Sequence, residues 1–455
     1  EPVAVIMSQS AIELPFTFLD RLVLRTPALP FINLLDEAKA DALIDDQFFM
    51  EAVYLASPVL YAECTRLIKG ELTDKKEIKK IRTSLIKYYQ RMYSRCTPFG
   101  LFSGCSLARW GDEQSHITLS ADKFFRSTRL DMHYLCALGQ QLSSLPVIQE
   151  RLSFFPNNSA YRIGNEVRYI EYRYQKGRRV HQISSVLHSE YLDAVLERTS
   201  SGARIHEIVD LLVAQQEVSA EEAISFIEEM ISSQVLISEM DPAITGEEFI
   251  HQLLAVLDKI NFDKNAAITA IHDKLEYILA SLKEIDNKAH NSTEIYVSLI
   301  EKINELTVPF EDGKLLQVDA FSKPLPNTIK SEWQNDLLST FGLLAKLFSS
   351  TVNENLSSFA ERFRKRYEDQ QVPLLQVLDA ETGIGYTERA SSNLSPLVEN
   401  LVLPGRNGGD SFDIKWNKTE QWLFDKLIRN PGEREIIIEA SELKEFADDF
   451  SNFPP

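Results

Sequence analysis

The sequence predicts an α+β protein in which helices are mixed with antiparallel sheets, with a winged-helix-like unit inserted between two larger regions. Three observations support this fold class: amphipathic stretches with helical spacing, short runs rich in β-branched and aromatic residues, and glycine or proline at the turns between them. The 455 residues are enough for more than one domain. We expect domain boundaries that give the ranges 1–150, 151–243 and 244–455.

In the first region, an extended segment ends at Pro27 and Pro30 because proline removes a backbone donor. Two stretches with helical spacing follow, and glycines then interrupt a strand-like run, LFSGCSLARW. The elements expected here are a strand within 16–31, helices over about 35–55 and 74–94, a strand over 101–110 and a helix from near Asp131.

The middle region has the element order of a winged helix. Val167–Tyr174 (VRYIEYRY) is typical of a strand, and Gly177 marks a turn. Ser219 and Glu222 have the spacing of a capping box, which predicts the start of a helix. The expected elements after the turn are helices over about 188–197, 205–214 and 220–232 and a closing strand over 235–238.

The last region is predicted to be mostly helical. LLQVDAF, which begins at Leu315, indicates a buried strand that carries one carboxylate, Asp319. Beyond Thr387 the pattern indicates loops rich in Asn, Gly and Asp. The other expected elements are helices over 247–284, 293–306 and 329–366, the last interrupted near 353, and strands over 372–378 and 434–439.

Composition and charge exclude several classes of protein. A net charge of −19 argues against a generic nucleic-acid binder, so a nucleic-acid ligand would need a local basic surface. No apolar run is long enough to span a membrane, and the first residues lack the features of a secretory signal. Four cysteines without C-x-x-C spacing indicate a reduced, cytoplasmic setting, and the scattered histidines predict no metal site.

A row of cations is predicted on one helix. At about 100° per residue, one arc of the helix over 76–95 carries five cations, with Glu77 at its edge, while isoleucine, leucine and methionine lie on the opposite side. A solvated helix face explains the row as well as an anionic partner does, and that partner could be the chain's own carboxylates. Thr97 precedes Pro98, which should end the helix in a stiff turn. The cations are Lys76, Lys80, Lys87, Arg91 and Arg95.

The run that ends this helix, RMYSRCTPFGLFSG at Arg91–Gly104, resembles the signature of the glutamylation region of lantibiotic dehydratases. Further pieces resemble family motifs in the family's order: LRTP at Leu24, RLDMHYL at Arg129, LLQVDAF at Leu315, and the block Phe359–Tyr386. The resemblance implies an enzyme that moves glutamate from glutamyl-tRNA to Ser and Thr hydroxyls of a precursor peptide, before the glutamate is eliminated. Glutamyl-tRNA would be a co-substrate, with no bound cofactor.

The resemblance also implies roles for particular residues. The positions that match the family's glutamylation residues are Arg91, Arg95, Thr97, Asp131 and Asp319. Binding of tRNA would involve Arg25, Lys80, Lys87, Arg91 and Arg95. The winged-helix-like unit would bind the leader of the precursor as an added strand, near Val167, Tyr169, Phe226 and Met230. Structural roles remain open: a turn hydroxyl for Thr97, a helix N-terminal charge for Asp131 and a core ion pair for Asp319.

Several alternatives stay open from the sequence. Family members continue well past the end of this chain, so the chain is either a fragment or one half of a split protein, in which case a separate elimination domain or cyclase is a partner; a homodimer is compatible with the sequence. The competing functions are a peptide aminoacyl-tRNA ligase and a non-catalytic scaffold that binds a leader peptide. A DNA-binding role is disfavoured because the third helix, EEAISFIEEMISS, is acidic. A second basic cluster at 362–366 is interpreted as a solvated helix face.

Overall fold

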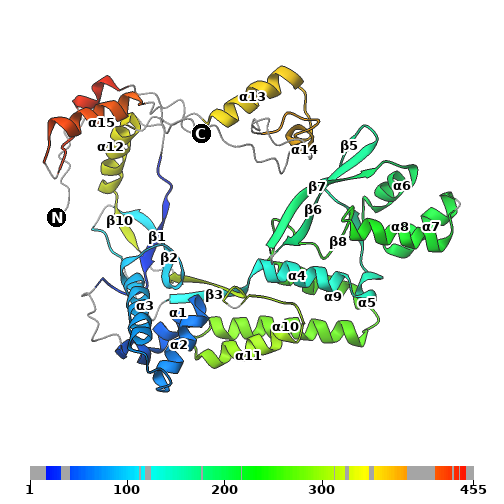
Figure 1. Cartoon of the computed structure of the whole chain (residues 1–455), viewed down its shortest axis with the longest axis horizontal. Coiled ribbons are helices and arrows are strands. Elements are labelled where there is room, and N and C mark those ends of the chain that lie inside the picture. The colour runs from blue at the N-terminus through cyan, green and yellow to red at the C-terminus, as the bar shows by residue number, and fades with distance from the viewer. Residues whose placement is uncertain are drawn as a thin grey trace. The chain divides into compact units, whose positions relative to one another are not determined.

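The computed structural model is a mixed α and β structure, as predicted (Figure 1). Contacts divide the chain into two compact units: a smaller one of residues 1–20, 110–115 and 329–455, and a larger one of residues 21–109 and 116–328. The positions 150 and 243 both lie inside the larger unit. The structure describes residues 17–31, 41–111, 114–117, 124–175, 178–216, 218–311, 313–322, 327–347, 353–386, 416–432, 435–439 and 441–446.

Helices make up most of the larger unit. They are α1 (Gln47–Ala56), α2 (Pro58–Ile68), α3 (Lys75–Ser94), α4 (Met132–Ser143), α5 (Pro146–Gln149), α6 (Glu190–Thr199), α7 (Ile205–Gln216), α8 (Ala220–Ser232), α9 (Phe249–Ile260), α10 (Ala266–Asp286) and α11 (Thr293–Asn304), with the 3-10 turn η2 (Asp41–Asp45) before α1. The smaller unit contains α12 (Glu332–Leu347), α13 (Glu354–Tyr367), α14 (Leu374–Leu378), α15 (Lys418–Arg429) and the 3-10 turn η4 (Glu442–Glu445).

The strands form three sheets. They are β1 (Arg21–Pro27), β2 (Gly100–Gly111), β3 (Phe124–Leu130), β4 (Phe154–Pro156), β5 (Tyr161–Ile163), β6 (Glu166–Gln175), β7 (Arg178–Leu187), β8 (Leu236–Ser238), β9 (Leu316–Ser322) and β10 (Thr328–Lys330). The largest sheet has the order β1-β2-β9-β3, with β10 also paired to β2. Its β1–β2 and β3–β9 pairs are antiparallel as expected, whereas β2 and β9 run parallel, so this sheet is mixed.

One face of the five-stranded sheet is buried. Val318 and Ala320 of β9 pack in a hydrophobic cluster with side chains of α1 to α3, and Arg126 and Thr128 of β3 are buried too. The residues that alternate with these along β3 and β9 point to the other face and are half-buried or exposed, as expected for a sheet with one solvated face. We call this second face the open face. Its side chains are Arg21, Val23, Arg25, Cys105, Leu107, Arg109, Phe125, Ser127, Arg129, Gln317, Asp319 and Phe321.

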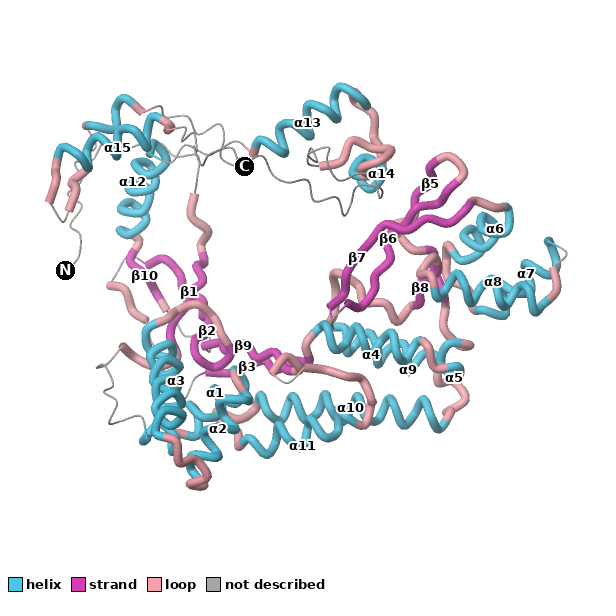
Figure 2. The backbone as a smooth tube through the Cα atoms, viewed as in Figure 1, coloured by secondary structure: helices cyan, strands magenta, loops and turns pink. Residues whose placement is uncertain are grey.

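The middle of the chain has the predicted strand–helix–helix–helix–strand order. β5, β6 and β7 form an antiparallel sheet with β6 in the centre, and β4 pairs with β8 (Figure 2). The capping box of α8 is present, with Ser219 and Glu222 bonded reciprocally. One hydrophobic cluster runs from Leu130 to Leu315 and includes residues of α4 and α8 to α11. The region 151–243 therefore shares its core with the helices that flank it, and its assignment as a winged helix stays a prediction.

Three predicted elements differ from the structure. Residues 372–378 were expected to be a strand, but Leu374–Leu378 is the helix α14, because a short apolar run does not distinguish the two and Pro373 has a backbone suited to a helix N-cap. The long helix over 247–284 is two helices, with a turn after Asn261 that Asn265 caps. No strand is assigned over the described residues 435–439. The helix start at 35 and the loops over 387–415 lie outside the described residues.

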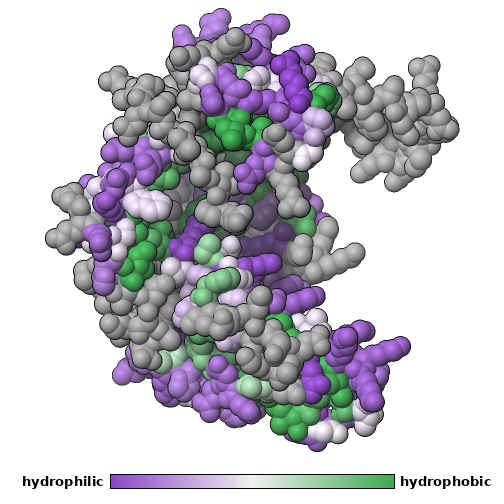
Figure 3. Space-filling view, turned by 90° about the vertical axis from the view of Figure 1, so that its left-hand side faces the viewer, coloured by the Kyte–Doolittle hydropathy of each residue, from purple (hydrophilic) through white to green (hydrophobic). Residues whose placement is uncertain are grey.

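Surface character agrees with the composition. Hydrophilic side chains cover much of the coloured surface in Figure 3, and hydrophobic groups form separate patches among them. None of the helices in the described part of the chain combines the length and apolar character needed to cross a bilayer.

Candidate functional site

The predicted cationic helix is α3, and its row of cations faces solvent. Ile81 and Leu85 are buried on one side of the helix, whereas Lys80 and Lys87 are exposed on the other. The spacing of apolar residues therefore fixed the orientation of the helix correctly. Arg95 lies just after the helix as its C-cap residue, so the row continues to the start of the next turn.

Arg91 and Arg95 lie at the C-terminal end of α3, where a positive charge interacts favourably with the helix dipole. The guanidinium carbon of Arg91 is 4.3 Å from the centroid of the Phe99 ring, a cation–π contact that orients this side chain. Arg91 is half-buried and Arg95 is exposed. Neither arginine has a carboxylate partner among the described residues, and the Arg91 Nε has no hydrogen-bond partner there. Both charges are thus available to an anionic ligand.

A hollow of about 480 Å³ adjoins these arginines. Three of its lining residues are cations and none is an acid, so it suits a phosphate or a carboxylate. The lining residues are Lys87, Tyr88, Gln90, Arg91, Ser94, Arg95 and Phe99.

The turn after α3 is held by its own hydrogen bonds. The Phe102 N–H donates to the Phe99 carbonyl at 3.0 Å, and the Ser103 hydroxyl donates to the Thr97 carbonyl. Gly100 has a φ of 52°, which glycine adopts without the strain that other residues would have. The Thr97 side chain is exposed on this turn. Thr97 is therefore fixed in position and accessible, although no contact assigns it a chemical role.

Asp319 lies beside this turn in the folded chain. In the parallel ladder between β2 and β9, Asp319 is the partner of Gly100. Its carboxylate is half-exposed and forms an ion pair with Arg129 of β3, with 2.8 Å between Nη2 and Oδ2. The ion pair fixes the position of the Asp319 carboxylate relative to β3. Arg129 belongs to one of the motifs that resemble the family, but no pattern in the sequence connects it with Asp319.

Asp131 lies farther along the same sheet. It is the N-cap of α4, where its carboxylate accepts a hydrogen bond from the His133 N–H at 2.8 Å. The Asp131 N–H donates to the Leu315 carbonyl at 2.8 Å. Leu315 is four residues before Asp319, which is a separation of about 13 Å in an extended strand. The helix-terminal role that the sequence left open is therefore real, and Asp131 is at a distance from the turn after α3.

A second hollow, of about 830 Å³, lies beside Asp131. Gln317, the partner of Arg129 in the β3–β9 ladder, also lines it, so this hollow adjoins the Arg129–Asp319 pair. Tyr134 lines it as well, and burial raises the pKa of that phenol. The full lining is Asp131, His133, Tyr134, Ala137, Pro309, Phe310, Glu311, Gly313, Lys314, Leu316 and Gln317.

Arg25 joins this region through the sheet. In the ladders it is the partner of Cys105, which is in turn the partner of Phe321 on β9. Side chains opposite one another in adjacent strands point to the same face, so exposed Arg25 lies on the open face with Asp319. The structure thus places Arg25 and Asp319 on one face of the sheet. Thr97 lies in the turn before β2, next to the end of β2 at which Gly100 pairs with Asp319.

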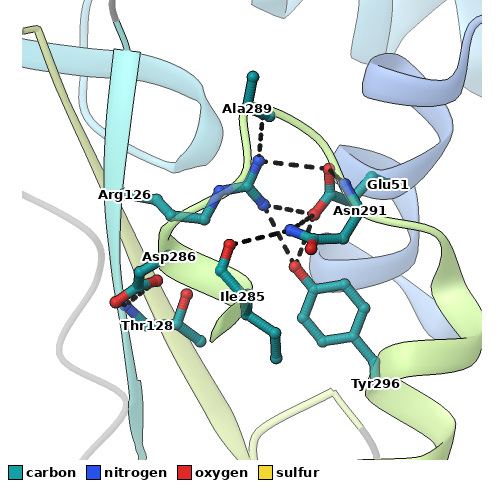
Figure 4. Close-up of polar contacts among 8 residues, drawn as sticks. All are labelled: Glu51, Arg126, Thr128, Ile285, Asp286, Ala289, Asn291 and Tyr296. Atoms are coloured by element: carbon teal, nitrogen blue, oxygen red, sulfur yellow. Dashed lines mark hydrogen bonds and ion pairs between the residues drawn. The ribbon is translucent and has the colours of Figure 1, made fainter. Parts of the chain in front are cut away.

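Below the sheet lies a buried ionic network that the sequence does not predict (Figure 4). The Glu51 carboxylate of α1 has no exposed surface and pairs with Arg126 of β3. It also accepts hydrogen bonds from the Tyr296 hydroxyl at 2.6 Å and from the Asn291 backbone N–H at 2.9 Å. Burial, and then the negative charge of Glu51, raise the pKa of Tyr296. This network ties α1, β3 and the segment before α11 together beneath the open face.

Asp286 adds a further polar contact to β3. Both of its carboxylate oxygens accept the Thr128 N–H at 3.0 Å, and burial raises the pKa of this carboxyl. No signal in the sequence identifies these partners, because Glu51, Arg126 and Asp286 lie in unrelated patterns.

The predicted peptide-binding residues are mostly core residues. Val167, Tyr169 and Met230 are buried, and Phe226 is half-buried against the same cluster. These side chains therefore stabilise the unit and do not offer a contact surface, which corrects the expectation. Alternating hydrophobicity identifies the buried face of a strand but cannot tell whether a ligand also reaches it.

The expected position of an added strand also changes. β6 is the central strand, with β7 paired along its whole length and β5 paired over 166–168. Beyond β5, the Gln234 side-chain amide bonds both backbone groups of Tyr172, at 3.0 and 2.8 Å. A peptide therefore cannot add to β6 without displacing existing bonds. Within the described residues, β7 is the long edge strand of this sheet, and the three-residue β5 is the other edge.

The second basic cluster is partly structural. Arg362 donates to the carbonyls of Ile384 and Tyr386, and Arg366 donates to those of Thr382 and Gly383. Across the described ranges, no group of three or more His, Cys, Asp or Glu side chains is arranged to hold a metal ion.

Comparison with known proteins adds family information to this geometry. The family model described as "Lantibiotic dehydratase, N terminus" matches residues 45–453. The subtilin biosynthesis protein SpaB of Bacillus subtilis is 25% identical over 350 residues, which cover 75% of this chain and 32% of SpaB. The nisin biosynthesis protein NisB of Lactococcus lactis subsp. lactis is 26% identical over 354 residues, 75% of this chain and 33% of NisB. The chain thus spans about a third of the length of these curated relatives.

Solved structures support the fold. The tRNA-dependent lantibiotic dehydratase MibB from Microbispora sp. 107891 matches 94% of this chain and 40% of its own, with a TM-score of 0.72 and 22% identity. The glutamylation domain of TbtB from thiomuracin biosynthesis matches 74% of this chain and 41% of its own, with a TM-score of 0.52 and 16% identity. At these identities the likeness concerns the fold.

Proposed function

Because the chain belongs to the family of lantibiotic dehydratase N-terminal regions, we propose that it transfers glutamate from glutamyl-tRNA to Ser and Thr hydroxyls of a precursor peptide. The reaction would take place in the cytoplasm, where charged tRNA is available. The observation that carries the proposal is that Asp319, paired with Arg129, lies in register with the turn that follows Arg91 and Arg95.

The chemistry fits such a site. Glutamyl-tRNA is an ester, so transfer to a hydroxyl exchanges one ester for another and needs no nucleotide hydrolysis. The attacking hydroxyl needs a base, and the oxyanion that develops at the glutamyl carbonyl needs positive charge. Asp319 would orient the acceptor hydroxyl, take its proton as the hydroxyl oxygen bonds to the glutamyl carbonyl carbon, and return that proton to the ribose oxygen of the tRNA as it leaves. Arg91 and Arg95 would bind tRNA phosphate or the glutamate carboxylate.

The remaining family positions take supporting roles in this proposal. Lys80 and Lys87 extend the cationic row along α3 and would contact the tRNA backbone. Asp131 would act from the far end of β9, beside the larger hollow, where the acceptor peptide has room to bind. Thr97 would supply an accessible hydroxyl next to the reacting groups.

Leader recognition is proposed at β7. A peptide strand can add to β7 because its outer edge has no partner strand in the described part of the chain. Val180, Ile183 and Leu187 are exposed on this strand and would provide apolar contacts. The strands and helices over 151–243 would then function as a winged-helix peptide-binding unit.

The test is transfer measured by mass spectrometry, with the protein at its natural length, glutamyl-tRNA and the precursor peptide. We expect an added glutamyl mass on Ser or Thr that is lost in mild base, as an ester is. Arg91→Ala and Arg95→Ala should abolish transfer. Lys302→Ala is the matched control, because it removes an exposed cation that pairs with Glu305 and lies on α11.

Other outcomes identify the competing functions. An added residue that survives mild base would indicate a peptide aminoacyl-tRNA ligase, which forms an amide. Leader binding without any transfer, and unaffected by either arginine change, would indicate a scaffold.

A further inference from the structure

We propose that the open face of the five-stranded sheet binds the unpaired 3′-terminal nucleotides of a tRNA, with a base stacked on Phe125 and Phe321. The inference deepens the proposed function and rests on it for the identity of the RNA. Neither phenylalanine belongs to the residues that the family motifs assign to glutamylation.

The rings of Phe125 and Phe321 are positioned so that a nucleic-acid base can stack on them. Phe125 and Phe321 are directly opposite each other in the β3–β9 ladder, and their rings are stacked with centroids 5.3 Å apart and an interplanar angle of 20°. Phe125 remains 40% exposed, so part of its ring is accessible to a ligand. Val23 and Leu107, partners in the β1–β2 ladder, are exposed on the same face. An exposed aromatic platform of this kind accepts any nucleic-acid base, because every base has a flat π face.

The charge of the open face is opposite to that of the chain. The face carries four arginines and one aspartate, whereas the whole chain has 48 Lys and Arg against 67 Asp and Glu. Arg21, Arg25 and Arg109 have no ion-pair partner among the residues that the structure describes, and only Arg129 is paired. Cations left without partners on a half-apolar surface attract a polyanion that also has flat apolar groups.

Single-stranded RNA is the polyanion that suits this surface. The accessible face of a sheet can take splayed bases on aromatic side chains and phosphates on arginines, whereas a duplex has its bases stacked inside. The position also suits a 3′ end. Asp319 is two residues from Phe321 on the same face of β9, about 7 Å away, so a base on the aromatic pair would leave its ribose close to Asp319.

The test is binding of a short single-stranded RNA that ends in CCA, labelled at its 5′ end and followed by fluorescence anisotropy. Phe125→Leu and Phe321→Leu keep an apolar side chain but remove the π face, and each should weaken binding about tenfold. Arg25→Ala should lower the slope of log affinity against log salt by roughly 0.7, the value for one phosphate contact on a single strand. Lys302→Ala should change neither quantity.

A second measurement is independent of these substitutions. Cys105 lies between Arg25 and Phe321 in the row of paired residues across the sheet, and it is partly accessible. In a Cys96→Ser background, saturating RNA should slow alkylation of Cys105 severalfold. Unfolding curves of both leucine variants would show whether the sheet is intact.

The outcomes separate this inference from the proposed function. RNA affinity that is unchanged in both leucine variants, with Cys105 unprotected, overturns the platform even if glutamate transfer occurs. Aromatic-dependent RNA binding without transfer supports the platform and removes the proposed function. Loss of precursor-peptide binding, instead of RNA binding, in Phe125→Leu would show that the face binds protein and would also overturn the inference.

Discussion

Replacing Arg126 by methionine should destabilise the larger unit strongly. The change leaves the Glu51 carboxylate buried, with no counter-charge, while Tyr296 and Asn291 still donate to it. Removing one partner of a buried ion pair costs about 3–5 kcal/mol, because the remaining charge has lost both water and its partner. Tyr296 and Asn291 reduce this loss of stability, but as neutral donors they do not replace the positive charge of Arg126. We therefore expect a loss of about 3–4 kcal/mol in the free energy of unfolding.

Urea unfolding followed by far-UV circular dichroism would measure this loss. Tryptophan fluorescence is unsuitable because Trp110, Trp333, Trp416 and Trp422 all belong to the smaller unit. The double variant Glu51→Met/Arg126→Met removes both charges and should recover part of the loss, as a double-mutant cycle would show.

Lys288→Ala is the matched control for this experiment, because it breaks an exposed pair with Glu284. Such a surface pair contributes at most about 1 kcal/mol. A loss of less than about 1 kcal/mol in Arg126→Met would refute the reasoning, since it would mean that the buried charge is solvated or neutral in the folded protein.

Three further predictions concern the site, a helix cap and the thiols. Arg129→Ala should lower the rate of glutamate transfer about 100-fold, within the usual range for one acid–base group, because Asp319 loses the ion pair that positions it; Arg129→Lys should restore part of the rate, and an unchanged rate in Arg129→Ala would count against a positioning role. Hydrogen bonds from Ser219 hold the pKa of Glu222 below its usual range, so this carboxylate contributes stability that is present above its unfolded pKa and is lost as the pH falls through its folded pKa. The difference in stability between the unaltered protein and Glu222→Gln should accordingly shrink as the pH falls below the usual range of a glutamate. Urea unfolding at several pH values measures this difference, and a difference that does not change with pH would contradict the prediction. Burial raises the pKa of the Cys64 thiol to about 11, so iodoacetamide should label exposed Cys96 at neutral pH and leave Cys64 unmodified until the protein unfolds; equal labelling of both in the folded state, read by peptide mass spectrometry, would contradict the buried position of Cys64.

Much of the fold could be predicted from the sequence, because many elements depend on interactions between residues that are close along the chain. The periodicity of α3 gave both the helix and the side that faces solvent, because apolar spacing records which face is buried. The capping box at Ser219 located the start of α8, since the hydrogen bonds that it needs are local in sequence. The motif around Thr97 indicated the family, which the family model then matched over residues 45–453.

The sequence could not show which distant segments pair. β2 and β9 are far apart along the chain, so their parallel register, which places Asp319 beside Gly100, comes from folding alone. The same holds for the ion pairs of Arg129 with Asp319 and of Arg126 with Glu51. Short apolar runs were ambiguous for a related reason: VPLLQVL has the composition of a strand, and only its surroundings made Leu374–Leu378 a helix.

Sequence by itself therefore determined most of the longer helices, the cap of α8, the cationic row and the family, because each depends on residues that are neighbours along the chain. Tertiary structure decided the open face, the free edge at β7 and the partners of Asp319. Those features depend on backbone hydrogen bonds and ion pairs between strands that meet only when the chain folds, and no local pattern encodes their register.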